Sequence, residues 1–208
     1  MLSYSAFDPS DAMRMQSAPM SDTHDAPGNQ DPAADSWILS DRPERPEEAC
    51  GVFGVWAEGE DVARLAYFGL HALQHRGQES AGICAVDAGV ARLHKRLGLA
   101  SEVFSAEVLE GLPGDTAVGH VRYSTAGGGH LANAQPIMVR YAHGDLAIAH
   151  NGNLTNAWDV RNRLVQEGAI FQTDSDSEVI IHLMARSRHD SVEGQIDEAL
   201  TYLEGAFS

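Results

Sequence analysis

A cysteine at position 50 opens the first strongly apolar segment of the chain, in the context EEACGVFGVW. A thiol with its usual pKa of about 8.5 is mostly protonated at neutral pH and needs a base to become a nucleophile. If the chain were cut after Ala49, the new α-amine of Cys50 would lie beside its own thiol. With a pKa of about 7.7–8.0, that amine could act as the base, directly or through one water. The alternative is that Cys50 is a small buried residue of a core strand.

Arg122 is a candidate for binding a negatively charged group. It lies in GHVRYST, a segment typical of a strand, where it shares a face with His120 and Ser124, opposite Val121 and Tyr123. A guanidinium can hold a carboxylate through two parallel hydrogen bonds. An ordinary surface ion pair would use the same residue type, so the residue alone leaves both interpretations open.

Two further motifs have a structural and a chemical interpretation. Asn151-Gly152, between apolar segments, predicts a turn, and a glycine there also lets the backbone approach a ligand closely. Asp176 lies in TDSDSE, where Ser175 and Glu178 have the spacing of a capping box, S-x-x-E. On that interpretation Asp176 is an acid in the first turn of a helix, where the helix dipole stabilises it.

Other candidates carry weaker signals. In LQHRGQESAG, His75 and Arg76 fit a solvent-facing loop and Gly77 fits a helix stop. Cys84 is predicted to be a core residue, and Gly127–Gly129 a flexible loop without the strand-loop-helix setting of a phosphate cradle. His71 and His75 have the H-x-x-x-H spacing, but none of the ten histidines forms a cluster with cysteine, so no metal site is predicted.

Composition excludes several classes of protein. The formal net charge of −16 argues against nucleic acid and against an anionic membrane surface as partners. The N-terminus has no apolar core of a signal peptide, and no run of 18 apolar residues predicts a membrane span. With two cysteines and no other sign of secretion, we expect a reduced, cytoplasmic protein.

The chain divides near its first cysteine. Residues 1–49 are rich in Asp, Pro, Ser and Gly and are predicted to be a disordered tail, in which Met13, Met15 and Met20 are alternative starts. From residue 50 the pattern is globular, and pairs of strands and pairs of helices favour an α+β sandwich over a parallel sheet. Strands are predicted at 50–57, 80–87, 90–98, 116–125, in a hairpin at 137–152 that turns at 143–145, and from 205 onward. Helices are predicted at 61–76 behind an Asp61 cap, 100–112, 156–168, 176–188 and 192–205.

Five motifs occur in the order found in one enzyme family. CGVFGVW, LQHRGQESAGI, GHVRYSTAG, AHNGNLTNA and TDSDSE together resemble the class II glutamine amidotransferases. HVRYSTAG is similar to the amidophosphoribosyltransferase family, whereas the sugar-phosphate amidotransferases carry a tryptophan-containing version, HTRWATHG. The resemblance covers residues 47–208. It implies an N-terminal-nucleophile fold, a four-layer αββα sandwich of two antiparallel sheets between helical layers.

The resemblance also implies a catalytic mechanism. Cys50 would attack the side-chain amide of glutamine, a thioester would form as ammonia leaves, and water would then release glutamate. The Asn151 side chain and the Gly152 backbone N–H would form the oxyanion hole. The acidic EEAC junction is similar to that of relatives made with a propeptide that they remove by self-cleavage, which would make residues 1–49 a propeptide.

Substrate binding follows from the same resemblance. Arg122 would hold the α-carboxylate of glutamine, Asp176 would bind its α-ammonium group, and Arg76 would border and support the pocket. Arg122 and Asp176 would then recognise the two oppositely charged groups of an amino acid.

The resemblance sets the expected scope of the chain. We expect residues 50–208 to be a class II glutaminase domain, truncated at its C-terminal end and without the phosphoribosyltransferase domain that binds phosphoribosyl pyrophosphate. The domain would supply ammonia for making 5-phosphoribosylamine, in the first step of purine synthesis, within an enzyme that is a homo-oligomer at full length. No cofactor is expected here, because Mg²⁺ and any [4Fe–4S] cluster would belong to the absent half and two cysteines cannot supply a cluster. The alternatives are a glutaminase that serves another acceptor, such as a sugar phosphate, and a non-catalytic amino-acid-binding module.

Overall fold

The computed structural model describes residues 50–123 and 130–207. The predicted tail at 1–49 and the predicted glycine loop at 127–129 lie outside these described residues. Every element below belongs to one unit of the chain, Arg45–Ser208.

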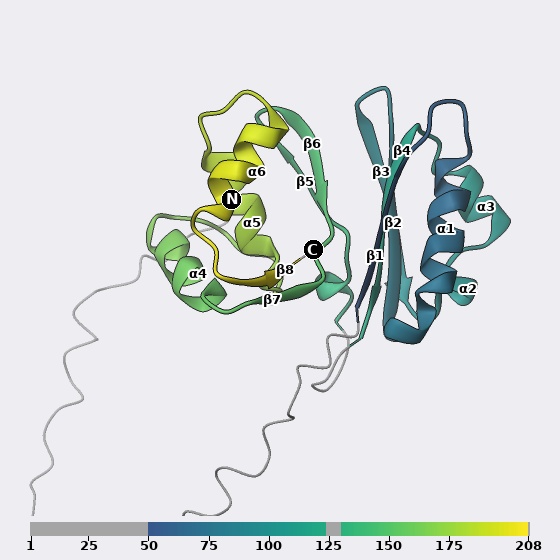
Figure 1. Cartoon of the computed structure of the whole chain (residues 1–208), viewed down its shortest axis with the longest axis horizontal. Helices are drawn as coiled ribbons and strands as arrows, with labels where there is room; N and C mark the ends of the chain where they lie inside the picture. Colours follow the sequence, from purple (N-terminus) through teal and green to yellow (C-terminus); the bar gives the residue numbers. More distant parts are fainter. Residues whose placement is uncertain (1–49, 124–129, 208) are drawn as a thin grey trace, which may run out of the picture. The chain divides into compact units, whose positions relative to one another are not determined.

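Four antiparallel strands form one sheet, in the order β1-β4-β2-β3 (Figure 1). Their bounds are Gly51–Trp56 for β1, Ser80–Asp87 for β2, Val90–Leu97 for β3 and Thr116–Arg122 for β4, close to the predicted strands. Gly51 lies opposite Val121, and Ser80 lies opposite Arg122. The starts of β1 and β2 therefore meet the end of β4, which brings Cys50 beside Arg122.

Three helices cover one face of this sheet, α1 (Val62–Ala72), α2 (Ala100–Val103) and α3 (Ala106–Glu110) (Figure 1). The predicted cap of α1 is confirmed, because Asp61 Oδ1 accepts a hydrogen bond from the Arg64 backbone N–H at 3.0 Å. Buried aliphatic side chains of these helices, such as Leu70, pack on inward-facing residues of the sheet such as Ile83. This is the first of two hydrophobic cores.

The prediction of a single helix at 100–112 was wrong. Phe104 has extended backbone angles and a buried side chain, which separates α2 from α3. Ser105 then starts α3 as its N-cap, and its Oγ accepts a hydrogen bond from the Val108 backbone N–H at 3.2 Å. Burying Phe104 in the core interrupts the helix, while Gly111 ends α3 as expected.

Two antiparallel strand pairs, three α-helices and a 3₁₀ turn, Leu131–Asn133, make up the rest of the unit. The strands are β5 (Ile137–Tyr141) with β6 (Gly144–Ile148), and β7 (Gly152–Leu154) with β8 (Gly205–Phe207). The helices are α4 (Ala157–Gln166), α5 (Glu178–Arg186) and α6 (Val192–Leu200), as predicted. The predicted turn was displaced: Tyr141 pairs with Gly144, so the turn lies at 142–143 and Asp145 belongs to β6.

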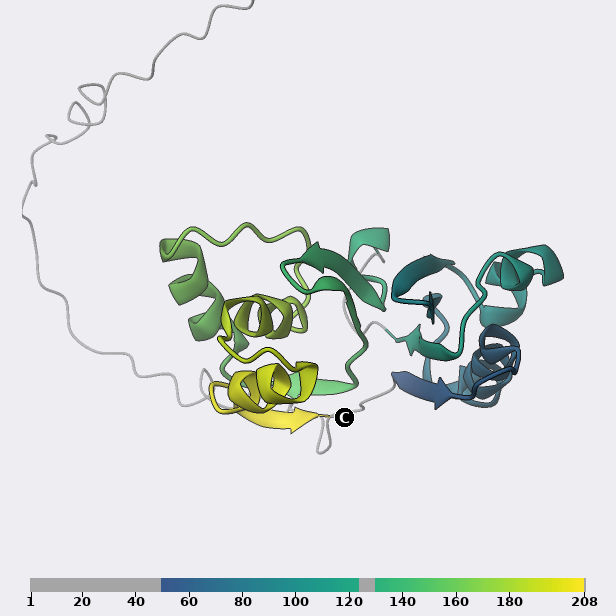
Figure 2. The same cartoon turned by 90° about the horizontal axis from the view of Figure 1, so that it is seen from above.

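The elements stack in the predicted order of an αββα sandwich. Helices α1–α3 lie outside the four-stranded sheet, β5 and β6 face its other side, and α5 and α6 lie beyond them (Figures 1 and 2). The second hydrophobic core lies between strands β5–β8 and helices α4–α6, and includes Leu146, Leu164 and Val179. The α+β fold class is thus confirmed, although the second layer of strands consists of two separate strand pairs, the β5–β6 hairpin and the pair of β7 with β8.

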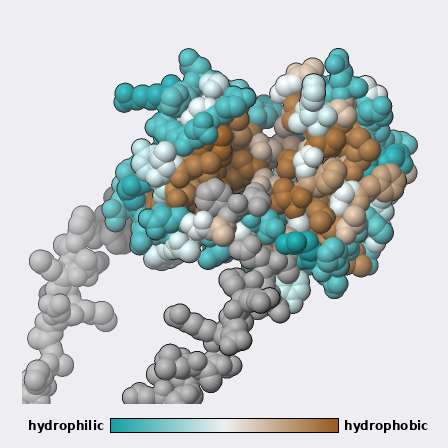
Figure 3. Space-filling view, viewed as in Figure 1, coloured by the Kyte–Doolittle hydropathy of each residue, from teal (hydrophilic) through white to brown (hydrophobic). Residues whose placement is uncertain are grey.

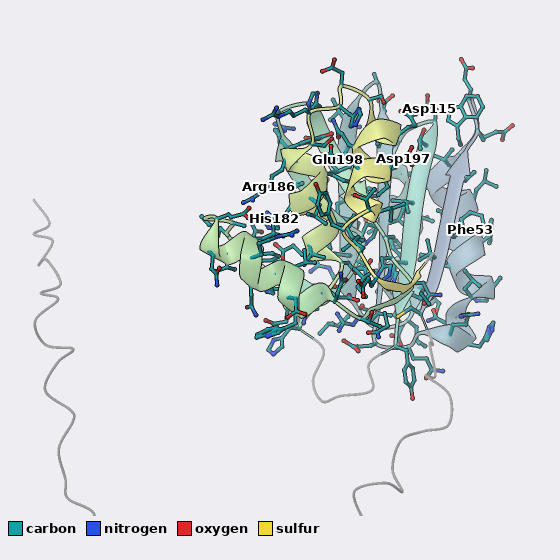
Figure 4. All side chains as sticks on the ribbon, turned by 60° about the vertical axis from the view of Figure 1, so that its left-hand side comes forward. Phe53, Asp115, His182, Arg186, Asp197 and Glu198 are labelled. Carbon is teal, nitrogen blue, oxygen red and sulfur yellow. The ribbon has the colours of Figure 1, made fainter. Side chains whose placement is uncertain are left out.

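The cores reach the surface on one face. Figure 3 shows apolar side chains gathered on two areas, one over the four-stranded sheet and α1 and one over the part that holds α5 and α6. Phe53 of β1 lies against α1 (Figure 4), where a Cβ on Gly69 would overlap its ring. The helices in the described part of the chain are too short or too polar to cross a membrane.

Candidate active site

One cavity of about 400 Å³ collects most of the residues that the sequence singles out. Cys50, Arg122, Gly152 and Asp176 all contribute to its lining. The other lining residues are Tyr123, Gln135, His150, Asn153, Asp174 and Ser175. Chain segments that are far apart in sequence therefore form one site.

Strand pairing places the thiol beside the guanidinium. Since Gly51 pairs with Val121, the next residues outward, Cys50 and Arg122, lie across from each other at the end of the β1–β4 ladder. Directly opposed residues of an antiparallel pair point to the same face. Cys50 is a half-buried free thiol, and its Sγ lies 3.9 Å from the backbone oxygen of Tyr123.

The guanidinium of Arg122 is held on two sides. Its Nη1 donates to the backbone oxygen of Asn133 at 2.5 Å, and its Nε lies 3.8 Å from Glu79 Oε1. The expected alternation of faces does not distinguish the neighbouring residues, because His120 and Val121 are both fully buried in a sheet that is covered on both sides. Arg122 reaches the cavity because it is the last residue of its strand.

Arg76 is bonded to the backbone of Cys50. Its Nε donates to the backbone oxygen of Cys50 at 2.9 Å, although Arg76 does not line the cavity. The segment can approach this closely because of Gly77, where a Cβ would overlap the backbone of Val121 and Arg122. Gly77 also ends a short 3₁₀ turn, Gln74–Arg76, which confirms the predicted helix stop.

The carboxylate of Asp176 is anchored at the opposite wall. Its Oδ2 accepts from the Leu154 backbone N–H, and its Oδ1 accepts from the Ser177 hydroxyl, both at 3.2 Å. The side chain is about one-third exposed, 31%, so it can still meet a ligand.

The predicted capping box at this position was wrong. Helix α5 begins at Glu178 behind Ser177, whose side chain makes no capping bond. The buried Glu178 carboxylate instead accepts from the backbone N–H groups of Gln172 and Thr173, both at 2.8 Å. The Glu178 carboxylate therefore holds the loop that carries Asp176, and bonds to Gln172 and Thr173 in place of the Ser175 N–H that a capping box would use.

A buried polar network behind the cavity was not predicted. Gln135 Oε1 accepts from the His150 backbone N–H at 2.7 Å, and Gln135 Nε2 donates to Ser177 Oγ at 3.3 Å. His150 Nδ1 lies 3.0 Å from the same Ser177 oxygen. Because Ser177 also contacts Asp176, the network connects the segment before Asn151 with the anchored carboxylate.

Asn151 lies between β6 and β7, and Gly152 is the first residue of β7. Gly152 has φ +151°, a conformation that side chains disfavour, and it lines the cavity. Asn151 is half-buried next to it but is not among the lining residues. The position of the predicted turn is thus the junction between the β5–β6 hairpin and β7, which pairs with β8.

Burial shifts the pKa values of two side chains in the four-stranded sheet, His120 and Cys84. It lowers the pKa of His120 to about 4, and the charge of Arg122 adds to the effect, so His120 is neutral at pH 7. It raises the pKa of Cys84 to about 11, helped by the charge of Asp145. Cys84 is a core residue, as predicted, and its thiol is protonated at neutral pH.

The chemistry open to this cavity follows from its charges. A thiol, a guanidinium and an anchored carboxylate suit a small zwitterion, and in particular an α-amino acid whose reactive end lies at the thiol. Within residues 50–123 and 130–207, no three His, Cys, Asp or Glu side chains are grouped as metal ligands.

Comparisons with known proteins agree with this geometry. A family model described as a glutamine amidotransferase domain matches residues 120–208. Amidophosphoribosyltransferase of Bacillus subtilis is 49% identical over 162 residues, which cover 77% of this chain and 34% of that protein. The enzyme of Synechococcus elongatus is also 49% identical, with 81% and 34% covered. The chain thus spans about a third of the length of these curated relatives.

Solved structures show the same fold. The structure titled as the allosteric regulatory enzyme of purine biosynthesis matches with a TM-score of 0.72 and 49% identity, covering 76% of this chain and 34% of that one. Glutamine phosphoribosylpyrophosphate amidotransferase from B. subtilis, complexed with ADP and GMP, matches with a TM-score of 0.69 and 46% identity, covering 75% of this chain and 33% of that one.

One curated sequence is matched over most of its length. Amidophosphoribosyltransferase of Lacticaseibacillus casei is 49% identical, and the match covers 77% of this chain and 83% of that relative. The chain therefore belongs to the amidophosphoribosyltransferase family.

Proposed function

We propose that the cavity binds glutamine and that Cys50, once it is the first residue of the chain, hydrolyses the side-chain amide. The observation that carries this proposal is the convergence of Cys50, Arg122, Gly152 and Asp176 on one cavity. Arg122 pairs with the α-carboxylate of glutamine and Asp176 with its α-ammonium group, which directs the amide toward the thiol.

The reaction proceeds in two steps. The α-amine of Cys50 takes the thiol proton, sulfur attacks the amide carbon, and the C–N bond breaks as the amine returns the proton to the departing ammonia. Water then attacks the thioester, which releases glutamate and regenerates the thiol. In each tetrahedral intermediate the Gly152 N–H and the Asn151 side chain bind the oxyanion, and Arg76 holds the Cys50 carbonyl in place.

The first step requires a free α-amine, so residues 1–49 act as a propeptide that must be removed. Cys50 follows Ala49 in the sequence and lies half-buried at the cavity, and its backbone oxygen is already held by Arg76. Residues 50–208 then constitute the glutaminase domain.

The destination of the ammonia is proposed from the relatives. Their name, amidophosphoribosyltransferase, supports phosphoribosyl pyrophosphate as the acceptor and 5-phosphoribosylamine as the product. We place the acceptor site and its Mg²⁺ in the part of the relatives that this chain does not span, and the complete enzyme in the cytoplasm as a homo-oligomer. A [4Fe–4S] cluster does not fit residues of this chain, since it takes four thiolates and the chain has two cysteines.

Glutamine hydrolysis by purified protein tests the proposal. Protein made from the full chain should release equal amounts of glutamate and ammonia from glutamine, and Cys50→Ala should release neither. Cys84→Ala is the matched control and should keep the activity, because Cys84 lies in the core. Activity that survives Cys50→Ala would overturn the proposed function.

A further inference from the structure

Asn133 contacts both charge-binding walls of the cavity. Its backbone oxygen accepts the 2.5 Å hydrogen bond from Arg122 Nη1. Its side-chain Oδ1 accepts a 3.0 Å hydrogen bond from the backbone N–H of Asp174, two residues before Asp176. Asn133 thus joins the strand end that carries the cation to the loop that carries the anion, without lining the cavity.

The neighbours of Asn133 hold it firmly. Lys95 Nζ donates to the backbone oxygen of Ala134. The buried Gln135 is bonded to the backbone of His150 through both ends of its amide, with Oε1 accepting at 2.7 Å and Nε2 donating at 3.3 Å. The segment therefore forms a fixed support under the site, against which the two charged side chains can be aligned.

The other anchors of Asp176 do not give this alignment. The Leu154 N–H and the Ser177 hydroxyl bond to its carboxylate, and Ser177 is bonded in turn to Gln135, whereas Arg122 donates to Asn133. Among the hydrogen bonds of the described residues, the bond from the Asp174 N–H to Asn133 Oδ1 connects this loop directly to the residue that accepts from Arg122. The α-carboxylate and α-ammonium of an amino acid have a fixed separation, so small errors between their two binding groups reduce productive binding.

We propose that Asn133 is a positioning residue, which sets the separation of Arg122 and Asp176 and so matches the cavity to a free α-amino acid. This inference rests on the proposed function. It goes beyond it by assigning substrate recognition to a residue outside the cavity wall.

Asn133→Ala separates the two contacts of Asn133. The variant keeps the backbone oxygen that binds Arg122 and loses the Oδ1 that binds Asp174. Loss of one such hydrogen bond should raise KM for L-glutamine roughly three- to tenfold with little change in kcat. Asn133→Ser should give the same rise in KM, because the serine oxygen is attached one atom nearer the backbone and does not reach the Asp174 N–H. This variant replaces Asn133→Ala if the alanine variant folds poorly.

Asn156→Ala is the matched control. Asn156 also accepts a backbone hydrogen bond through Oδ1, from Glu204 at 2.9 Å, but it lies outside the cavity. The same type of substitution removes the same type of bond there, together with the bond from Asn156 Nδ2 to the Tyr202 backbone oxygen, and KM should stay at the wild-type value. A general loosening of the fold would affect both variants equally.

A double-mutant cycle separates positioning from structure. If Asn133 acts through Asp176, adding Asn133→Ala to Asp176→Asn should raise KM by less than twofold more, whereas independent effects would multiply. Wild-type protein that hydrolyses no glutamine would overturn the proposed function itself. Active wild type with an unchanged KM in Asn133→Ala, an equal KM change in Asn156→Ala, or a multiplicative double variant would overturn this inference alone.

Discussion

Cys50 and Arg122 face each other at the end of the β1–β4 ladder, because Gly51 is in register with Val121. The register therefore places the Cys50 thiol, the proposed nucleophile, beside the group proposed to bind the α-carboxylate. Asp176 completes the site from a loop in the other half of the unit.

Charge recognition is tested by Arg122→Ala and Asp176→Asn. Each leaves one substrate charge without its partner, which typically costs about 2–5 kcal/mol, so kcat/KM for glutamine should fall about 30-fold to several thousand-fold. Steady-state glutaminase kinetics measures the loss, and thermal melts establish that the variants fold.

The matched controls are Arg140→Ala and Asp159→Asn, at exposed positions outside the cavity. Both should keep wild-type kinetics. Alkylation of Cys50 by a small neutral reagent should be nearly unchanged in all four variants, because that reagent carries no charge to bind. Near-normal glutamine kinetics in both Arg122→Ala and Asp176→Asn would refute the proposed pocket.

The two thiols should differ in reactivity. Burial and the raised pKa of about 11 protect Cys84, whereas Cys50 is half-buried at the cavity. A small alkylating reagent at pH 7.5, followed by peptide mapping, should therefore modify Cys50 well before Cys84. In a denaturant the difference should disappear, and equal rates in the folded protein would show that the core around Cys84 opens.

His120 makes stability depend on pH. Its pKa is about 6.5 in an unfolded chain and about 4 in the fold, so the unfolded state binds more protons between these values. The stability is present above pH 6.5 and is lost as pH falls toward 4, with about 2 kcal/mol lost between pH 7 and pH 5.

The measurement is urea unfolding of the wild type and His120→Asn at pH 7 and pH 5. The wild type should lose about 2 kcal/mol more than the variant over this interval. His143→Asn, in the exposed β5–β6 turn, should follow the wild type. Parallel losses in wild type and His120→Asn would contradict the assignment.

Gly69 tests the packing of α1 on β1. Gly→Ala inside a helix normally stabilises by about 1 kcal/mol. Here the new Cβ would overlap the Phe53 ring, so Gly69→Ala should destabilise by about 1–3 kcal/mol in denaturant unfolding. The smaller side chain of Phe53→Leu should reduce that loss in the double variant. A gain in stability from Gly69→Ala would show that the ring moves aside freely.

Much of the fold follows from local patterns in the sequence. Apolar periodicity predicted most strands and helices in approximate position, and the Asp61 cap is a local signal, but the three-residue strand β7 was not predicted as a separate strand. The break between α2 and α3 was missed because the apolar pattern of residues 100–112 fits one helix. The burial of Phe104, which interrupts that helix, depends on tertiary packing and leaves no local signal. The capping box failed for a related reason, because Glu178 bonds to Gln172 and Thr173, which precede the motif.

The cavity was only partly predictable. Five motifs indicated Cys50, Arg122, Gly152 and Asp176, which line it, and Arg76 and Asn151, which do not. The supporting residues Asn133 and Gln135 were missed because their partners are distant in sequence, 41 residues away for Asn133 and Asp174. No periodicity marks such a contact, and only the assembled fold reveals it.

The central claim is that Cys50 becomes the N-terminal nucleophile of a glutamine site. The most direct measurement treats the protein with an amino acid of glutamine's length that carries an electrophilic carbon in place of the amide, and then determines intact mass and maps the labelled peptide. We predict one label per chain, on Cys50, in protein that begins at Cys50, with glutamine slowing the labelling. Labelling of protein that retains residues 1–49, labelling at Cys84, or labelling that glutamine does not slow would contradict the account.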